Sequence, residues 1–476
     1  MVDPLDGCTV PDALQMYVNA GSNVADDPSK RLFHNDWGIK RHRASSYPTN
    51  EDDSPMWTLI VVTVLITTIV VVISVNFHRP EKTVRHAITH CHGIRDPQFE
   101  LEMDAMLGPD VLEGNSITAL QNGDEIFPAM LQAIRGATQS ITFETYIYWS
   151  GDIGKQFADA LKERATAGVP VHVMLDWAGS DKMEAALLEE LIDAGIQVKR
   201  YHPLRWHSIS RLNNRTHRKL LIVDGRVGFT GGVGIADQWQ GHAQDKDHWR
   251  DIHFRAEGPI VGQLQAGFMD NWIKTTGRVL HSAIYYPPLQ KTGDRRMHLF
   301  VSSPAGGNVS MHLMYLLAVA AASTSIDLQA AYFIPDPIMI DALVDACKRG
   351  VRIRLLVPGR YIDSALVRMA SKRTWGKLLS AGMEVYEYQR TMMHNKMLIL
   401  DGLLVSVGST NFDMRSFNLN DEASLNIYSE AFAQQMTDVM AADLRDATPY
   451  TLDMWRRRPL IQKIGEVLIR PFESQL

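Results

Sequence analysis

Two stretches of the chain carry one pattern, THRKLLIVDGRVGFTGG at 216–232 and MHNKMLILDGLLVSVGSTN at 393–411. In each, a His, one variable residue and a Lys are followed by an apolar run, an Asp and then a turn of small residues. The apolar run predicts a buried strand in both stretches. Because residues i and i+2 of a strand share a face, the His and the Lys of one stretch should point the same way. The Asp ends the strand with the opposite parity and should brace the structure.

The sequence before each stretch repeats as well. ALKERATAGVPVHVMLDW at 160–177 corresponds to ALVDACKRGVRIRLLVPG at 342–359, and in both a helical pattern ends at a Gly before a strand rich in Val and Ile. Alternating helices and strands with an internal repeat predict an α/β fold. We therefore expect two tandem repeats, at 121–290 and 291–450, each a mixed sheet flanked by helices, packed with pseudo-twofold symmetry.

The rest of the chain divides by composition. Residues 1–55 are polar, and we expect a flexible tail there. The stretch MWTLIVVTVLITTIVVVISVNF at 56–77 has no charge, and about 20 apolar residues cross a bilayer, so we expect a transmembrane helix rather than a buried core strand or helix. Residues 78–120 read as a connector and 451–476 as an amphipathic segment. Basic residues shortly after 77 favour a cytoplasmic catalytic portion.

The overall composition limits the class of function. The 476 residues include 48 Lys and Arg against 54 Asp and Glu, a formal net charge of −6. A protein that coats nucleic acid is normally basic, so any anion site here must be local. A local field precedes the first motif, because residues 194–223 include seven Lys or Arg and no acidic residue. The three cysteines, Cys8, Cys91 and Cys347, form no C-x-x-C pair, which disfavours a disulfide scaffold and a cysteine zinc site.

The twin motifs suit the chemistry of a phosphodiester. One imidazole can attack phosphorus and form a covalent intermediate, while the other protonates the leaving alkoxide and then deprotonates the incoming alcohol or water. The ammonium groups stabilise the negative charge on the phosphate oxygens. Nothing in the motifs resembles a carboxylate cage for a metal, so we expect neither a metal nor another cofactor. A single motif would be read as core histidines and surface lysines, but duplication disfavours that reading. The candidate catalytic residues are His217, Lys219, Asp224, His394, Lys396 and Asp401.

The duplicated motif resembles that of the phospholipase D superfamily, and within it the chain is most similar to bacterial cardiolipin synthases. The narrower resemblance rests on NRTHRKLLIVDGRVGFTGG at 214–232, WRDIHFRAEGP at 249–259 and GSTNFDMRSFNLNDE at 408–422. It covers about residues 115–476. The resemblance implies that both expected repeats are phospholipase D-like α/β units.

The resemblance also implies catalytic roles. His217 would be the nucleophile and His394 the acid and base, while Lys219 and Lys396 would hold the phosphate oxygens. The turns that follow the motifs would add hydrogen bonds to the phosphate, through Gly231, Gly232, Ser409 and Asn411.

Downstream carboxylates are implied to orient the imidazoles through their second ring nitrogens. Glu422 fits this place in the second copy, and Asp251 is its counterpart in the first. The first copy departs from the family pattern at Gly234, where the second copy has Asn411. A fully symmetric site is therefore in doubt.

By this resemblance the chain is expected to condense two phosphatidylglycerols to cardiolipin and glycerol through a phosphohistidine intermediate. Its partners would be phosphatidylglycerol, the cardiolipin product and an anionic membrane surface, and its location the bacterial inner membrane. The alternative is a phospholipase D-type hydrolase with water as the acceptor. The anchor and the net charge disfavour a nuclease or nucleic-acid-binding module, and two intact motifs disfavour a non-catalytic scaffold.

Overall fold

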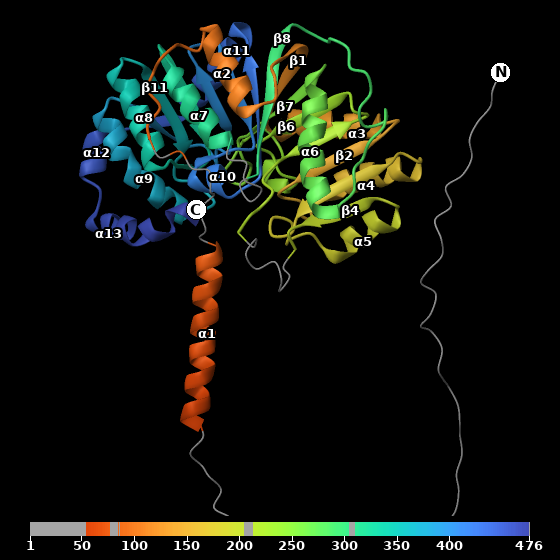
Figure 1. Ribbon diagram of the computed structural model, residues 1–476, viewed down its shortest axis with the longest axis horizontal. Coiled ribbons are helices and arrows are strands. Elements are labelled where there is room, and N and C mark those ends of the chain that lie inside the picture. The colour runs from red at the N-terminus through yellow and green to blue at the C-terminus, as the bar shows by residue number, and fades with distance from the viewer. Residues whose placement is uncertain (1–53, 77–83, 85, 204–212, 304–309, 476) are drawn as a thin grey trace, which may run out of the picture. The chain divides into compact units, whose positions relative to one another are not determined.

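The computed structural model in Figure 1 describes residues 54–76, 84, 86–203, 213–303 and 310–475. The chain divides into two compact units, Met1–Thr63 and Val64–Leu476. Almost all of the expected tail at 1–55 lies outside the described residues, as does part of the basic run at 194–223.

The uncharged stretch forms helix α1 (Ser54–Asn76), and its side chains from 56 to 71 are exposed. Within the ranges that the structure describes, no helix combines the length and the apolar character that crossing a membrane requires. The transmembrane helix predicted for 56–77 is therefore not confirmed.

One large sheet organises the second unit, in the order β17-β12-β11-β9-β13-β14-β16-β8-β1-β7-β6-β5-β2-β3-β4. Strands β2, β3 and β4 are parallel, as are β9, β11 and β12, and the other pairings within this sheet are antiparallel. The strands are β1 (Leu112–Gln121), β2 (Ile141–Thr145), β3 (Val171–Asp176), β4 (Gln197–Tyr201), β5 (Leu220–Val223), β6 (Val227–Gly231), β7 (Ile252–Glu257), β8 (Arg295–Ser302), β9 (Ser325–Ala330), β11 (Arg352–Pro358), β12 (Glu384–Tyr388), β13 (Lys396–Leu400), β14 (Leu404–Gly408), β16 (Glu422–Tyr428) and β17 (Ala447–Tyr450), with β10 (Phe333–Ile334) and β15 (Phe412–Asp413) as a separate pair.

Helices pack against this sheet in both halves (Figure 1). They are α2 (Pro97–Leu107), α3 (Asn122–Arg135), α4 (Asp152–Thr166), α5 (Ala185–Asp193), α6 (Ile260–Thr276), α7 (Ser310–Ala321), α8 (Pro337–Lys348), α9 (Ala365–Ser380), α10 (Met414–Asn418), α11 (Glu430–Arg445), α12 (Leu452–Arg456) and α13 (Leu460–Ile469), with short 3-10 turns η2 (Asp237–Trp239) and η4 (Arg470–Gln475).

The strand order repeats between the two halves. Outward from the central pair β1 and β8, the first half runs β1-β7-β6-β5-β2-β3-β4 and the second runs β8-β16-β14-β13-β9-β11-β12, with β17 at the far edge. The first strand of each half thus lies beside a strand from late in that half, β1 beside β7 and β8 beside β16. The predicted α/β class with a mixed sheet is confirmed, while the pseudo-twofold packing stays a prediction.

Strand β1 begins inside 78–120, the segment expected to be a connector, and ends at Gln121. It pairs with β7 from Ser116 to Gln121 and with β8 at Leu112 and Asn115, so it joins the two halves of the sheet. Its opening residues include Gly114 and Asn115, which are depleted in strands and hide the strand pattern in the sequence.

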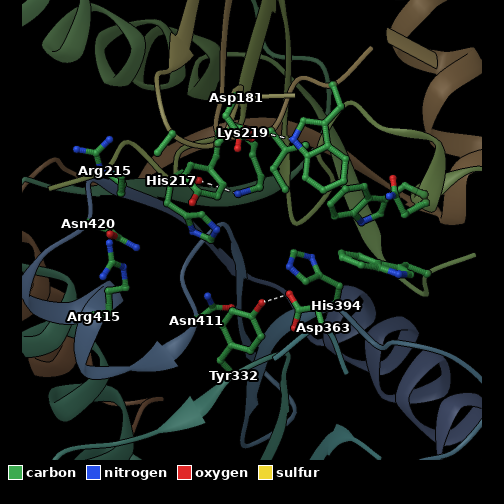
Figure 2. A pocket seen from close by; sticks show the side chains of 18 of the residues that line it. Asp181, Arg215, His217, Lys219, Tyr332, Asp363, His394, Asn411, Arg415 and Asn420 are labelled. Carbon is green, nitrogen blue, oxygen red and sulfur yellow. Dashed lines mark hydrogen bonds between the residues drawn. The ribbon is translucent and has the colours of Figure 1, made fainter. Parts of the chain in front are cut away.

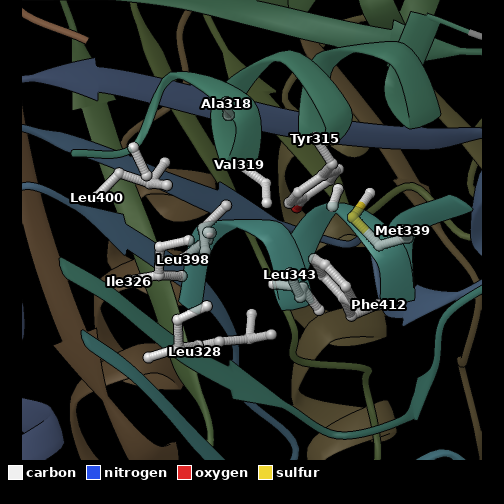
Figure 3. Packing of buried hydrophobic residues seen from close by; sticks show 14 of the residues in the cluster. Tyr315, Ala318, Val319, Ile326, Leu328, Met339, Leu343, Leu398, Leu400 and Phe412 are labelled. Atoms are coloured by element: carbon white, nitrogen blue, oxygen red, sulfur yellow. The ribbon is translucent and has the colours of Figure 1, made fainter. Parts of the chain in front are cut away.

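The three largest apolar clusters of the described residues hold the layers together. One packs α3 and α4 against the first half of the sheet, and another packs α7 and α8 against the second. Figure 3 shows the latter, where Ile326 and Leu328 of β9 lie near Val319 of α7 and Leu343 of α8. The third cluster contains Phe268 of α6 together with Phe432 of α11. Because it draws on both halves, the halves share a core at the centre of the sheet.

Candidate active site

The two His-x-Lys motifs meet at one cavity of about 490 Å³. Figure 2 shows His217 and His394 on either side of it, with Lys219 and Asn411 nearby. A volume of this size is in the range of small-ligand pockets. Further described residues that line it are Tyr146, Ile147, Trp149, Ala178, Gly179, Asp181, Lys182, Arg215, Gln238, Trp239, Trp249, Tyr332, Asp363, Asp413, Arg415 and Asn420.

Backbone hydrogen bonds fix each imidazole against the other half of the chain. The N–H of His217 donates to the carbonyl of Asp421 at 2.9 Å, and the N–H of Asp421 donates to Arg215 at 2.8 Å. In the same way the N–H of His394 donates to the carbonyl of Arg250 at 2.7 Å. Each motif therefore begins at a junction between the halves.

The lysines lie beside the histidines, as the strand parity predicted. The Nζ of Lys219 donates to the carbonyl of His217 at 2.9 Å, and the Nζ of Lys396 donates to the carbonyl of His394 at 2.8 Å. All four side chains are buried against the protein, with 3 to 8% of each residue exposed. Lys219 lines the cavity, whereas Lys396 is not among the described residues that line it, and its Nζ lies 3.1 Å from the ring nitrogens of His394.

Each imidazole is bonded to a carboxylate of the opposite half. The Nδ1 of His217 donates to Glu422 at 2.9 Å, and the Nδ1 of His394 donates to Asp251 at 2.9 Å. The expected pairing of each carboxylate with the His of its own copy is therefore wrong. Asp251 immediately precedes β7 and Glu422 opens β16, and these strands flank the central pair β1 and β8. Their ends consequently reach the neighbouring half, which spacing along the sequence does not reveal.

The two carboxylates are held by different donors. The hydroxyl of Ser409 donates to Glu422 at 2.6 Å, whereas the indole Nε1 of Trp239 donates to Asp251 at 2.9 Å. The hydroxyl of Ser409 was expected to contact phosphate, but Ser409 is fully buried and is not among the described residues that line the cavity. Its hydroxyl supports Glu422 instead.

The glycine turn of the first copy is explained by the same carboxylate. A Cβ on Gly232 would lie 2.3 Å from an Asp251 oxygen, so Asp251 occupies the space that a Ser there would need. Neither Gly231 nor Gly232 is among the described residues lining the cavity, and their expected contact with phosphate is not supported. Gly232 has no hydroxyl to donate to Asp251, so Asp251 needs another donor, and Trp239 supplies it. The Gly in place of Ser is the sequence feature that could have indicated such a donor.

The departure at Gly234 also has a packing cause. A Cβ at this position would lie 2.8 Å from the Cβ of Ile147, so the first copy has no room for an amide. Its counterpart Asn411 does line the cavity, and the Oδ1 of Asn411 is buried without a hydrogen-bond partner. An amide side chain at this position of the turn is thus present on one side of the cavity only.

Asp224 and Asp401 brace the fold, as the strand parity predicted. The carboxylate of Asp224 accepts the backbone N–H groups of 138–140, and that of Asp401 accepts those of 323–325. Both residues have a positive φ, 54° and 51°, at the end of their strands. Neither Asp is among the described residues that line the cavity. Their role in the motif is therefore to hold the backbone rather than to contact a ligand.

Burial sets the charge of the cavity. It lowers the pKa of His217 well below its ordinary value, and the charges of Lys219 and Lys396 lower it further. Burial and Lys396 also lower the pKa of His394, although Asp251 opposes this. Burial and Lys396 bring the pKa of Lys219 to about 7, and burial brings that of Lys396 to about 8. Burial thus destabilises the cationic forms of both lysines and of both histidines. An anionic ligand in the cavity would stabilise the lysine cations.

The two carboxylates differ in charge state. Burial raises the pKa of Glu422 to about 7. Burial also opposes the charge of Asp251, but the hydrogen bond from His394 and the charges of His394 and Lys396 outweigh it and hold the pKa of Asp251 below its ordinary value. An anionic Asp251 stabilises a protonated His394, so the environments of the imidazoles are unequal.

Arg218, the variable residue of the first motif, is fully buried rather than part of a solvated basic surface. Its guanidinium donates to the carbonyls of Gly267 at 2.7 Å and Ser302 at 2.8 Å, and to the carboxylate of Asp270 at 2.9 Å. It also reaches the carbonyl of Glu422 at 3.3 Å. Arg218 thereby ties the first motif to the strand that carries Glu422.

No group of three or more His, Cys, Asp or Glu side chains is arranged to hold a metal ion in the part of the chain that the structure describes. The residues of the cavity are suited instead to an anion through ammonium, guanidinium and amide donors.

Comparison with known proteins matches these two halves to one family. Segments 130–247 and 315–444 match the family model described as cardiolipin synthase, PLD-like domain, and each segment contains one His-x-Lys motif. The cardiolipin synthase of Geobacillus sp. (strain WCH70) is 33% identical over 354 residues, which cover 74% of this chain and 70% of that protein. The major cardiolipin synthase of Bacillus subtilis (strain 168) is 33% identical over 363 residues, 75% of each chain.

Among solved structures, the phosphatidylserine synthase of Haemophilus influenzae Rd KW20 superposes with a TM-score of 0.62. The superposition covers 79% of this chain and 100% of that chain, at 14% sequence identity. At this identity the likeness concerns the fold alone.

The indole donor to Asp251 gives a first prediction. Trp239→Phe removes the N–H and retains an aromatic ring, and we expect turnover of the phosphodiester substrate to fall about 10- to 100-fold, because a hydrogen bond to a charged group is lost. Steady-state kcat measures this. Trp249→Phe is the matched control, since Trp249 also packs on His394, at 5.6 Å between ring centroids. Equal losses in both variants would contradict a role for the Nε1 bond.

The lowered lysine pKa values give a second prediction. A lysine is cationic only below its pKa, so kcat/KM should fall as pH rises through about 7 to 8 while Lys219 and Lys396 lose their protons. On the acid side His217 must stay neutral to attack phosphorus, and its pKa lies well below its ordinary value, so the acid limb should lie below pH 6.5. A pH profile of kcat/KM checks both limbs, and a flat profile from pH 7 to 9 would contradict the account.

Proposed function

We propose that this chain, which belongs to the cardiolipin synthase family of phospholipase D-like proteins, joins two phosphatidylglycerol molecules into cardiolipin and releases glycerol. The chain is a phospholipid phosphatidyltransferase of the cardiolipin synthase type. The observation that carries the proposed mechanism is the pair of imidazoles on one cavity, each with a carboxylate at its Nδ1.

In the first step His217 attacks phosphorus of the donor phosphatidylglycerol. Because its Nδ1–H is donated to Glu422, its Nε2 carries the lone pair that attacks. A bond forms between Nε2 and phosphorus, and the bond from phosphorus to the glycerol oxygen breaks. His394 gives its proton to the leaving alkoxide, so glycerol departs and a phosphatidyl-histidine remains.

In the second step a hydroxyl of another phosphatidylglycerol gives its proton to His394 and attacks the same phosphorus. The bond between phosphorus and His217 breaks, cardiolipin is released and both imidazoles return to their starting states. Each bond broken in one step is matched by one formed, so the exchange needs no outside energy source.

The assignment of these roles is supported by the unequal carboxylates. The pKa of Asp251 lies below its ordinary value, so Asp251 is anionic and favours the protonated form of His394. The pKa of Glu422 is raised to about 7 by burial, which gives His217 less support as a cation. Both imidazoles have lowered pKa values, but Asp251 opposes the lowering at His394, so His394 is the more easily protonated of the two. This difference supports His217 as the neutral nucleophile and His394 as the proton carrier.

Lys219, Lys396 and Asn411 are the proposed holders of the phosphate oxygens. Both ammonium groups are buried, and the charge of Lys396 lowers the proton affinity of Lys219, a cost that an anionic phosphate nearby would offset. Asn411 lines the cavity, so the N–H groups of its side-chain amide can donate to a phosphate oxygen. Preorganised donors of this kind stabilise the charge that rearranges in the transition state.

A membrane surface is the proposed place of the reaction. Helix α13 exposes an apolar row of Leu460, Ile461, Ile464, Val467 and Leu468, each 59 to 81% exposed. Basic residues at 456, 457 and 470 are exposed beside it. This combination suits an anionic lipid surface. We further propose that the uncharged segment 56–77 attaches the chain to the bacterial inner membrane, with the catalytic unit on the cytoplasmic side.

The product assay tests the proposed reaction. The full chain with phosphatidylglycerol vesicles should form cardiolipin and glycerol in equal amounts. His217→Ala and His394→Ala should each lower the rate at least about 1,000-fold, because transfer needs both the nucleophile and the proton carrier. His242→Ala, at an exposed position, is the matched control. Phosphatidic acid as the main product would assign hydrolysis instead, and wild-type-like turnover in either variant would remove that residue from the mechanism.

The apolar row of α13 gives another prediction. Replacing Leu460, Ile464 and Leu468 together by Ser should lower kcat/KM on phosphatidylglycerol vesicles at least about tenfold, because apolar area no longer enters the bilayer. Turnover of dispersed short-chain phosphatidylglycerol should stay at the wild-type rate. Ile192→Ser on α5, also an exposed apolar position, is the control. An equal fall on both substrates would contradict a surface-binding role.

A further inference from the structure

The cavity has two chemically different ends. Figure 2 shows Arg215, Arg415 and Asn420 on the far side of His217, while Tyr332 and Asp363 lie beside His394. The rings of Tyr332 and His394 have centroids 6.3 Å apart and lie nearly at right angles. Asp363 is two residues before α9, and Tyr332 directly precedes β10. The end near His394 thus combines an aromatic hydroxyl with a carboxylate.

Asp363 is a carboxylate without the imidazole partner that Asp251 and Glu422 have. The hydroxyl of Tyr332 donates to it, and within the described residues it forms no ion pair with a Lys or Arg and no bond to an imidazole. It is exposed where it lines the cavity, unlike the buried Asp251. Burial and the charge of Asp363 raise the pKa of Tyr332 well above its ordinary value, so Tyr332 keeps its proton and remains a donor to Asp363.

A negative charge at this position opposes the binding of a phosphodiester. Asp363 is close enough to His394 and Lys396 to favour their protonated forms. Among the residues that the structure describes, it accepts no backbone N–H as Asp224 does and bonds no imidazole as Asp251 does. A carboxylate that accepts hydrogen bonds and repels phosphate is suited to the neutral, hydroxyl-bearing part of a substrate.

We propose that Asp363, held by Tyr332, binds the free hydroxyl of the glycerol headgroup next to the one that reacts. This inference rests on the proposed function, in which His394 exchanges the proton of the alcohol, so that the leaving glycerol and the accepting headgroup both occupy the His394 end. When one hydroxyl of the headgroup faces His394, its vicinal neighbour is within reach of a group beside that imidazole. Asp363 accepts this second hydroxyl.

The consequence is selectivity for vicinal diols as acceptors. A site that hydrogen-bonds a substrate hydroxyl discriminates strongly against an analogue that lacks it. Glycerol and phosphatidylglycerol carry the second hydroxyl, whereas ethanol does not. Asp363 therefore determines which alcohol takes the phosphatidyl group, and it does so by binding the acceptor rather than by taking part in the proton transfer.

A partition experiment on the full chain tests this inference. Phosphatidylglycerol vesicles are supplied with labelled glycerol and ethanol at equal concentrations, and the initial rates of labelled phosphatidylglycerol and phosphatidylethanol formation are compared. Both products arise from one intermediate, so their ratio is independent of the first step. Asp363→Ala should lower the ratio of glycerol to ethanol transfer about 10- to 100-fold.

Two further variants sharpen the result. Tyr332→Phe keeps the ring but loses the hydroxyl that holds Asp363, and the ratio should fall in the same direction by a smaller factor. Asp181→Ala removes another exposed carboxylate that lines the same cavity and should leave the ratio at the wild-type value. An unchanged ratio in Asp363→Ala, or an equal fall in Asp181→Ala, would overturn the inference. A wild-type chain that forms neither product would contradict the proposed function itself, and the inference would fall with it.

Discussion

Each imidazole of the cavity is oriented by a carboxylate that belongs to the other half of the chain. The bonds from His217 to Glu422 and from His394 to Asp251 are each 2.9 Å long, and all four groups are buried. A buried carboxylate without its partner would be costly, so neither half satisfies its own polar groups alone. The shared apolar cluster around Phe268 and Phe432 keeps the halves in the register that these bonds require.

The same arrangement makes the two sides of the cavity unequal. Glu422 is supported by a hydroxyl of the preceding turn, whereas Asp251 fills the corresponding space at Gly232 and is supported by an indole. Small differences in packing thus give one imidazole an anionic partner and the other a partner with a raised pKa. A duplicated fold can in this way divide the tasks of nucleophile and acid between two identical motifs.

What the sequence predicted correctly depends on local geometry. The shared face of His and Lys, the bracing role of Asp224 and Asp401 and the alternation of helix and strand all follow from the period of a strand or helix. The crossed carboxylates, the support from Trp239 and the burial of Arg218 depend on which strands become neighbours at the centre of the sheet. Residues far apart in sequence make these contacts, so no pattern of spacing predicts them.

Trapping the covalent intermediate tests the crossed arrangement most directly. A phosphatidyl donor with a nitrophenolate leaving group needs no acid, so only the nucleophile is required for the first step. In Asp251→Asn, where His394 no longer takes a proton efficiently, mass spectrometry after acid-free quenching should find the phosphatidyl group on the peptide that contains His217. Glu422→Gln should yield no such adduct. An adduct on His394, or accumulation in Glu422→Gln and not in Asp251→Asn, would contradict the account.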